Sequence, residues 1–313
     1  MAEPLEVVDG VALIEGYDFV ADLHVLSILD TVERGVLWAP VTDGVRSAAG
    51  AASVGVLALL YDVIASAPAL AAVRPDWTAT QSLALHATDW LVEGPAVVDA
   101  SVVRAGKKVV VVAADVWDAR GIDDPVELLG TFDALPDGVA GTATRRPGGD
   151  APGDPVLVAR GLLTFARLPG SAAGRFAESH DPKDTLGKVQ RRWTSGEVDG
   201  TVWDRIGVRE IDGAGGVVEL PLIPYITNSI GTINGGALAM MIERGAEVMR
   251  PGLVATDLSI QYLSQLKVGP ARTRGTVSRD ARDHSVVAIE VLDHGNDDHV
   301  LALATVTLQT PPG

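Results

Sequence analysis

Apolar and polar residues alternate in the C-terminal part of the chain, where Leu258, Ile260 and Tyr262 are separated by Ser259 and Gln261. This alternation predicts a β-strand with one buried face. Further strands are predicted at 201–211, 216–222, 272–279, 285–292 and 300–308. A long apolar segment at 234–250, followed by Pro and Gly, predicts a helix among them. A helix that is apolar on most sides needs cover on most sides, so we expect a curved antiparallel sheet around it.

The N-terminal half of the chain repeats this order of elements. Strands are predicted at 36–40, 80–88, 97–104, 109–117 and 157–168, and a helix is predicted from 53 to about 66. The halves also share residues at constant offsets, since Gly94-Pro95 recurs 175 positions later as Gly269-Pro270, and Asp62 aligns with Glu243 at an offset of 181. The repeat predicts two domains, 18–170 and 201–313, joined by a linker at 171–200. A Gly-, Pro- and Asp-rich segment at about 119–155 has no counterpart in the second copy, and we interpret it as an exposed loop insertion.

Composition narrows the possible partners and compartments. The net charge of −16 argues against nucleic acid, which is bound largely by Lys and Arg clusters. The chain has no cysteine, so disulfides and thiolate metal sites are excluded. The acidic start of the chain lacks the features of a secretory signal, and we expect a cytoplasmic protein. The apolar segment 48–73 is long enough to span a membrane, but Asp62 and Pro68 interrupt it, so we interpret it as a buried helix and expect no membrane partner.

Two further patterns could indicate chemistry. The run AASVG at 51–55 approximates the nucleophile elbow of the α/β-hydrolases, but its first Gly is missing. The His and Asp residues at 294–299 could be drawn as a metal site, yet they fall in a predicted turn, where polar residues are common. We therefore expect neither a serine nucleophile nor a bound metal.

The segment 228–243, NSIGTINGGALAMMIE, resembles the motif of hotdog-fold acyl-CoA thioesterases of the phenylacetate-pathway type and of the 4-hydroxybenzoyl-CoA thioesterase type. In that motif an Asn or Gln is followed by His-Gly-Gly and then by an acid, and this chain keeps the spacing with Asn228, Gly235 and Glu243. Asn234 stands where the family usually has His. The resemblance implies an α+β fold of two hotdog domains in tandem, each a curved antiparallel β-sheet wrapped around a long apolar helix.

The resemblance also implies a catalytic site to which both copies contribute. In the family, backbone N–H groups at a helix start stabilise the oxyanion, and a carboxylate acts as nucleophile or general base. Carried over to this chain, the motif combines Asn228, Asn234 and Gly235 of the second copy with Asp62 and Ser66 of the first. We expect Asp62 to be the reacting carboxylate, helped by Ser66. Asn228 would orient the carbonyl group or water, and the Gly235 amide would be the oxyanion donor.

The reciprocal site would combine Ser47, Ser53 and Val54 with Glu243 and Glu247. It has Val in the place of Gly at the amide position, and a carboxylate where the family has a hydroxyl group. We expect it to be the weaker of the two sites, with Glu243 as the alternative catalytic acid.

The resemblance implies an acyl-CoA substrate and no cofactor beyond the coenzyme A that the substrate carries. Asn234 and Gly236 at the helix start are expected to contact this substrate. An acidic protein needs local positive charge to bind the phosphates of coenzyme A. The candidates lie at corresponding hairpin positions and are Lys107, Lys108, Arg279 and Arg282. We expect a homodimer of double hotdogs with a role in lipid metabolism.

Two other functions share this fold. A dehydratase or hydratase would use a catalytic His, and neither predicted helix contains one. A protein that binds acyl-CoA or a fatty acid without turnover stays open, because Asn234 replaces the His of the family. Release of free coenzyme A distinguishes an enzyme from such a binding protein.

Overall fold

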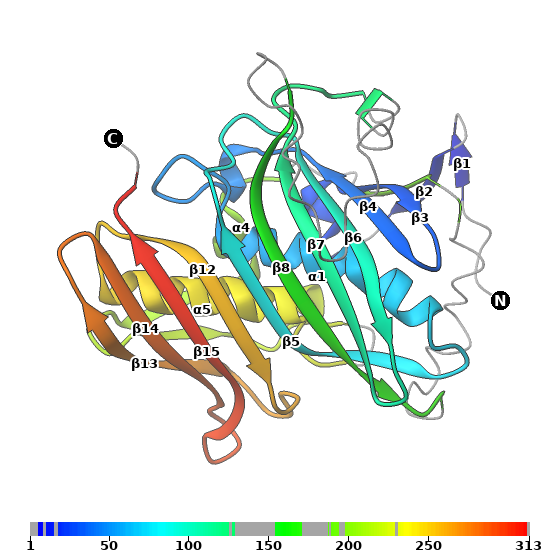
Figure 1. The fold of residues 1–313 in the computed structure, drawn as a ribbon. Coiled ribbons are helices and arrows are strands. Elements are labelled where there is room, and N and C mark those ends of the chain that lie inside the picture. The colour runs from blue at the N-terminus through cyan, green and yellow to red at the C-terminus, as the bar shows by residue number, and fades with distance from the viewer. Residues whose placement is uncertain are drawn as a thin grey trace. The chain divides into compact units, whose positions relative to one another are not determined.

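The chain divides into two compact units (Figure 1). Unit 1 comprises Met1–Val41, Leu60–Thr80 and Thr88–Val198, and unit 2 comprises Thr42–Leu59, Gln81–Ala87 and Asp199–Gly313. The computed structural model describes residues 6–8, 11–15, 18–124, 127–128, 154–170, 187, 189–193, 198–228 and 231–311. Most of the predicted insertion and most of the predicted linker lie outside these residues. Helix α1 (Val54–Ala71) begins in unit 2 and continues into unit 1, whereas strand β5 (Trp77–Ala87) begins in unit 1 and continues into unit 2.

The sheet of unit 1 has the strand order β1-β2-β9-β3-β4-β6-β7-β8 among the residues described. Neighbouring strands are antiparallel, apart from β2 and β9, which are parallel. The bounds are Glu6–Val8 for β1, Val11–Glu15 for β2, Leu26–Asp30 for β3, Arg34–Ala39 for β4, Ala96–Ala105 for β6, Val109–Asp118 for β7, Val156–Leu168 for β8 and Val189–Trp193 for β9, with a 3-10 helix η1 at Ala21–Leu23.

The second part of α1 packs tightly on the sheet of unit 1. The Tyr61 hydroxyl accepts a hydrogen bond from the Ala114 N–H of β7 at 3.0 Å. A Cβ atom on Gly35 of β4 would lie 2.9 Å from side-chain carbons of Ile64, so only glycine fits there. By length and composition α1 could cross a membrane, but 72% of it is buried within the protein. The prediction of a buried helix is therefore confirmed.

Unit 2 contains the second long helix, α5, and an antiparallel sheet with the order β5-β12-β15-β14-β13-β11-β10. Helix α5 packs against β11 to β15 and buries Met240, Met241 and Ile242 completely. The bounds are Val202–Ile206 for α4, Arg209–Asp212 for β10, Val217–Leu220 for β11, Gly235–Met249 for α5, Val254–Tyr262 for β12, Ala271–Asp280 for β13, His284–Asp293 for β14 and His299–Gln309 for β15, with 3-10 helices η2 at Asp43–Val45 and η5 at Pro224–Ile226.

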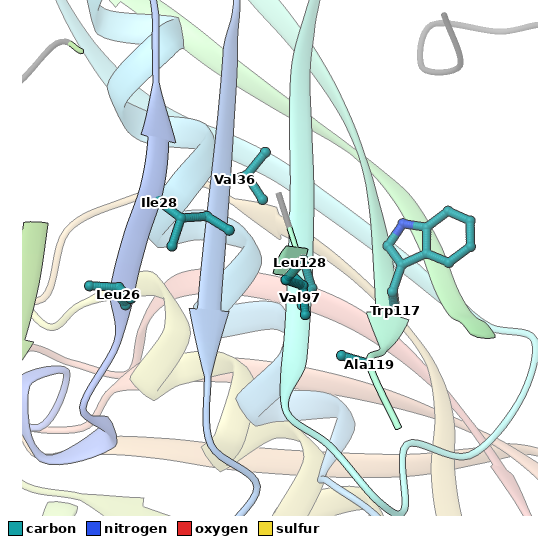
Figure 2. Packing of buried hydrophobic residues seen from close by; sticks show 7 residues of the cluster. All are labelled: Leu26, Ile28, Val36, Val97, Trp117, Ala119 and Leu128. Atoms are coloured by element: carbon teal, nitrogen blue, oxygen red, sulfur yellow. The ribbon is translucent and has the colours of Figure 1, made fainter. Parts of the chain in front are cut away.

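The start of the predicted insertion belongs to the core of unit 1. Figure 2 shows an apolar cluster that includes Leu128, Val97 of β6 and Trp117 of β7. The side chains of Ala119 and Leu128 are fully buried. The interpretation of 119–155 as an exposed loop is therefore wrong for these two residues, because an apolar side chain in the insertion covers apolar side chains of the sheet. Residues 125–126 and 129–153 lie outside the description.

Two elements differ from their predictions. The strand predicted at 201–211 is divided into α4 and β10. Helix α4 forms because Thr201 and Asp204 cap it reciprocally, and Gly207 ends it with φ 80°. Helix α1 continues past the predicted end at 66 to Ala71 with Pro68 inside it, so the proline does not end the helix.

The repeat in the sequence is also a repeat of backbone contacts. In unit 1 the Asp118 carboxylate accepts the N–H groups of residues 92–94 at 2.8–3.0 Å. In unit 2 the Asp293 carboxylate accepts those of residues 267–269 at 2.7–3.2 Å. Both acceptors hold the loop that enters a Gly-Pro pair, Gly94-Pro95 or Gly269-Pro270. Buried carboxylates with several N–H donors fix backbone geometry firmly, which explains why this aspartate occurs in both copies.

Candidate functional site

Unit 2 contains two helix starts built on the same turn. The Ser47 N–H binds the Ala51 carbonyl at 2.8 Å before α1, and the Asn228 N–H binds the Thr232 carbonyl at 2.8 Å before α5. The first amides of a helix have no acceptor inside the helix, and the helix dipole makes this end positive. Each start can therefore bind a negatively charged or electron-rich oxygen. The two starts differ in whether a protein group already binds there.

The start of α1 is occupied by Glu243 of α5. The Ser53 hydroxyl donates to Glu243 Oε2 at 2.5 Å, and the N–H groups of Val54 and Gly55 donate to the same carboxyl group. Ser53 Oγ in turn accepts the N–H of Val56 at 3.2 Å. The structure thus brings together Ser53, Val54 and Glu243, which the repeat had paired in the reciprocal site. The donors at this helix start are already used.

Burial dominates the electrostatics of Glu243, whose exposed fraction is 2%. Desolvation is the largest cause that raises its pKa to about 8. The neighbouring Glu247 carboxylate acts in the same direction, and the hydrogen bonds from Ser53 and the helix amides oppose the rise. Burial also raises the pKa of Glu247. The N–H of Ala255 donates to Glu247 at 3.2 Å and opposes this rise. Glu243 Oε1 has no hydrogen-bond partner among the described residues. Glu243 is therefore mostly protonated at neutral pH.

Fewer of the backbone N–H groups at the start of α5 have an acceptor among the described residues than at the start of α1. Asn234 is the N-cap, and its Oδ1 accepts the N–H of Gly236 at 2.8 Å. The Gly235 carbonyl accepts the Tyr262 hydroxyl at 2.9 Å. Within the described part of the chain, the N–H of Gly235 makes no hydrogen bond. The first residue of α5 therefore presents a donor at the positive end of a helix, as an oxyanion site requires.

Two glycines bring the helices into contact in unit 2. A Cβ atom on Gly55 would lie 2.7 Å from Met240 Cα and 2.7 Å from Glu243 Oε2. A Cβ atom on Gly236 would lie 2.6 Å from Leu59 Cβ and 2.8 Å from Leu59 Cα. Glycine is needed at both places because no side chain fits between the helices. For Gly236 the sequence suggested an open approach for substrate, whereas the structure gives it a packing role against Leu59.

Asp62 lies on the part of α1 that belongs to unit 1, and its exposed fraction is 8%. Thr80 Oγ1 donates to Asp62 Oδ1 at 2.7 Å. Burial raises the pKa of Asp62 to about 6, and the hydrogen bond from Thr80 opposes this rise. The Ser66 hydroxyl donates to the backbone carbonyl of Asp62 at 2.6 Å, so it serves the helix backbone. Thr80 is the partner that sequence reasoning missed, because nothing in its spacing singles out a hydroxyl on the strand after the helix.

The remaining predicted residues are placed as follows. Asn228 Oδ1 accepts the N–H of Thr232 at 3.2 Å and so belongs to the turn before α5. Asp62 and Ser66 belong to unit 1, whereas Asn228, Asn234 and Gly235 belong to unit 2, and their joint action stays a prediction. The four basic residues proposed for phosphate binding are exposed and lie in or beside the β6–β7 and β13–β14 turns: Lys107, Lys108, Arg279 and Arg282.

Comparison with known proteins relates this fold to thioesterases. No protein-family model and no curated protein sequence matches the chain. A structure described as an oleoyl thioesterase from Lactobacillus plantarum is 8% identical, with 90% of this chain and 96% of that chain covered and a TM-score of 0.55. A structure described as a thioesterase II from Thermobifida fusca is 12% identical, with 97% of this chain and 99% of that chain covered and a TM-score of 0.52. A 12:0-ACP thioesterase from Umbellularia californica is 9% identical, with 88% and 93% covered and a TM-score of 0.51.

These likenesses concern the fold, since the sequence identities are low. The chain shares the hotdog fold of these thioesterases, a large antiparallel sheet with few helices. Fold alone does not establish an activity, so the chemistry must be argued from the residues of this chain.

Proposed function

We propose that this protein is a thioester hydrolase that cleaves acyl-CoA into a carboxylic acid and free coenzyme A. The observation that carries the proposal is the contrast between the helix starts of unit 2. The start of α1 is filled by the Glu243 carboxyl group, whereas the Gly235 N–H at the start of α5 has no acceptor among the described residues. A free amide at a helix start is suited to the negative charge that develops on a thioester oxygen.

Asp62 is the carboxylate that we propose for the chemistry. With a pKa of about 6 it is mostly ionised at neutral pH, whereas Glu243, with a pKa of about 8, is mostly protonated. A nucleophile or general base must be ionised to react. One Asp62 oxygen accepts from Thr80, which stabilises the ionised form.

Two routes are open to this carboxylate. As a nucleophile, Asp62 would attack the acyl carbon and expel the coenzyme A thiolate, and water would then hydrolyse the acyl anhydride. As a general base, Asp62 would take a proton from the attacking water, and the thiolate would leave in the same way. In both routes the Gly235 N–H would stabilise the oxyanion and Asn228 would orient the carbonyl group or water.

The finer assignment follows the motif at 228–243. We propose that the two units are hotdog domains in tandem, of the phenylacetate-pathway or 4-hydroxybenzoyl-CoA type, and that two chains pair in a cytoplasmic homodimer. The recurring Asp118 and Asp293 contacts support the tandem arrangement, because each unit builds the same loop with the same side chain.

The test is a thiol-release assay over a panel of acyl-CoA and aryl-CoA esters. The purified protein should release coenzyme A from at least one ester, and Asp62→Asn should lower kcat/KM for it by about 100-fold or more, the usual size of a general acid–base contribution. Glu93→Gln, a change at an exposed position in unit 1, serves as the control and should match the parent. Saturable binding of the esters with no release of coenzyme A would overturn the proposal in favour of a binding protein.

A further inference from the structure

We propose that Glu243 is a positioning residue: its carboxyl group ties the start of α1 to α5 and thereby fixes the first turn of α5, which carries the Gly235 N–H. This inference rests on the proposed function and assigns a role to the acid that the motif would otherwise make catalytic. The residues that carry it, Ser53, Leu59, Gly236 and Glu243, all lie in unit 2.

The first step is the attachment of α1. Glu243 Oε2 receives the Ser53 hydroxyl at 2.5 Å, and the amides of Val54 and Gly55 donate to the same carboxyl group. These amides lack acceptors within their own helix, so Glu243 supplies what an N-cap side chain usually supplies, but from another helix. Removing the Glu243 carboxyl group would leave these buried donors without an acceptor. The free energy of unfolding would fall, because each unpaired buried donor loses its hydration without gaining a hydrogen bond.

The second step is the transmission to α5. Leu59 lies one turn beyond Gly55 on α1 and packs directly on Gly236, where an added Cβ atom would lie 2.6 Å from Leu59 Cβ. Gly236 follows Gly235, so the backbone that presents the Gly235 N–H is held from one side by Leu59. An oxyanion donor must be placed to within a fraction of an ångström, and small displacements cost much of the rate.

Glu243 itself is poorly suited to be the reacting carboxylate of the thioester hydrolysis. Its exposed fraction is 2%, and its carboxyl group already has three donors. The groups that face it are Ser53 and the amides of α1, with Glu247 on its own helix and Arg244 acting on Glu247. Burial raises its pKa to about 8, so the proton stays on at neutral pH and the group acts through hydrogen bonds.

The experiment compares the parent with Glu243→Gln, Glu243→Ala and the exposed control Glu93→Gln. Glutamine keeps an oxygen that can accept the three hydrogen bonds, so kcat should stay within about threefold of the parent and the acidic limb of the pH profile should be unchanged. Alanine removes the acceptor, so kcat should fall about tenfold or more with a smaller change in KM. Hydrogen exchange in the first turn of α5 should accelerate in Glu243→Ala and stay parent-like in Glu243→Gln.

The outcomes separate this inference from the proposed function. A parent that releases no coenzyme A overturns the proposed function, and hydrogen exchange then still tests whether Glu243 fixes the first turn of α5. Two results overturn the inference. One is a Glu243→Gln variant as inactive as Glu243→Ala while its exchange matches the parent, which would make Glu243 the reacting acid. The other is parent-like exchange in the first turn of α5 in Glu243→Ala.

Discussion

The starts of α1 and α5 are built alike and occupied differently. Both follow a turn closed by the same 2.8 Å hydrogen bond, at Ser47 and at Asn228. Yet the amides of α1 bind a carboxyl group of the protein, while the Gly235 N–H of α5 has no acceptor among the residues described. One helix start of unit 2 therefore serves the fold, and the other is open to a ligand.

The two glycines at the helix contact should be equally intolerant of a methyl group. Gly236→Ala places a Cβ atom 2.6 Å from Leu59 Cβ, and Gly55→Ala places one 2.7 Å from Met240 Cα. Each change should lower the free energy of unfolding by about 1–3 kcal/mol, the usual cost of overpacking. Urea unfolding measures it. As a control, Leu59→Ala in the Gly236→Ala background should recover part of the loss. A stable Gly236→Ala single variant would show that the contact with Leu59 does not constrain α5.

The proton on Glu243 should make stability depend on pH above neutrality. The pKa of Glu243 is raised from 4.5 to about 8, so the stabilisation is fully present below pH 4.5 and is lost as the pH rises through about 8. The pKa of Asp62 is about 6, so its own loss is nearly complete by pH 7.5. Unfolding at pH 7.5 and pH 9 should show a smaller decrease in Glu243→Gln than in the parent. Equal decreases would mean that Glu243 is already ionised at neutral pH.

Thr80 should set the pH at which the proposed catalyst becomes active. Its hydroxyl donates to Asp62 Oδ1 at 2.7 Å and favours the ionised carboxylate. Thr80→Val removes the donor and should move the acidic limb of kcat/KM from about 6 to a higher pH. The expected shift is about 1 pH unit, since one such hydrogen bond contributes about 1 kcal/mol. Thr80→Ser, which keeps the hydroxyl, should leave the limb in place. If the acidic limb of Thr80→Val is unchanged, the group that titrates in the pH profile is not Asp62.

The basic hairpins should give the smallest effect and show which unit serves coenzyme A. Lys107 and Lys108 lie at the β6–β7 turn. Arg279 lies near the end of β13, and Arg282 lies in the β13–β14 turn. Replacing one pair with alanine should raise KM about two- to fivefold at low salt, because exposed charges contribute little each and are screened. The pair that does not bind phosphate should leave KM unchanged. Parent-like KM values in both double variants would remove these residues from the proposed site.

Much of the fold follows from periodicity and from the repeat. The helix predicted at 234–250 is α5, and the strand alternation at 258–263 corresponds to β12. The residues that depart from prediction do so through tertiary contacts. Leu128 is buried because it covers an apolar cluster, which a Gly- and Pro-rich composition conceals. Helix α4 depends on a capping pair, Thr201 and Asp204, within a segment whose apolar pattern favours a strand.

The candidate site was less predictable than the fold. The motif identified both acids, Asp62 and Glu243, but spacing alone does not tell which one is neutral. Burial raises the pKa of both carboxyl groups, and the neighbouring Glu247 carboxylate raises that of Glu243 as well. Gly236 shows the same limit of sequence reasoning. The sequence alone does not distinguish a glycine that is needed for helix packing from one that leaves room for a substrate.

The most direct test of the central claim is to observe the two helix starts while a ligand binds. Protein with glycine labelled by nitrogen-15 would be titrated with an acyl-CoA ketone analogue, which keeps the acyl oxygen but has no thioester bond to cleave. The account predicts that the amide signal of Gly235 moves on binding and that the signal of Gly55, held by Glu243, stays in place. Movement of the Gly55 signal with an unmoved Gly235 signal would contradict it and would place the acyl oxygen at the start of α1.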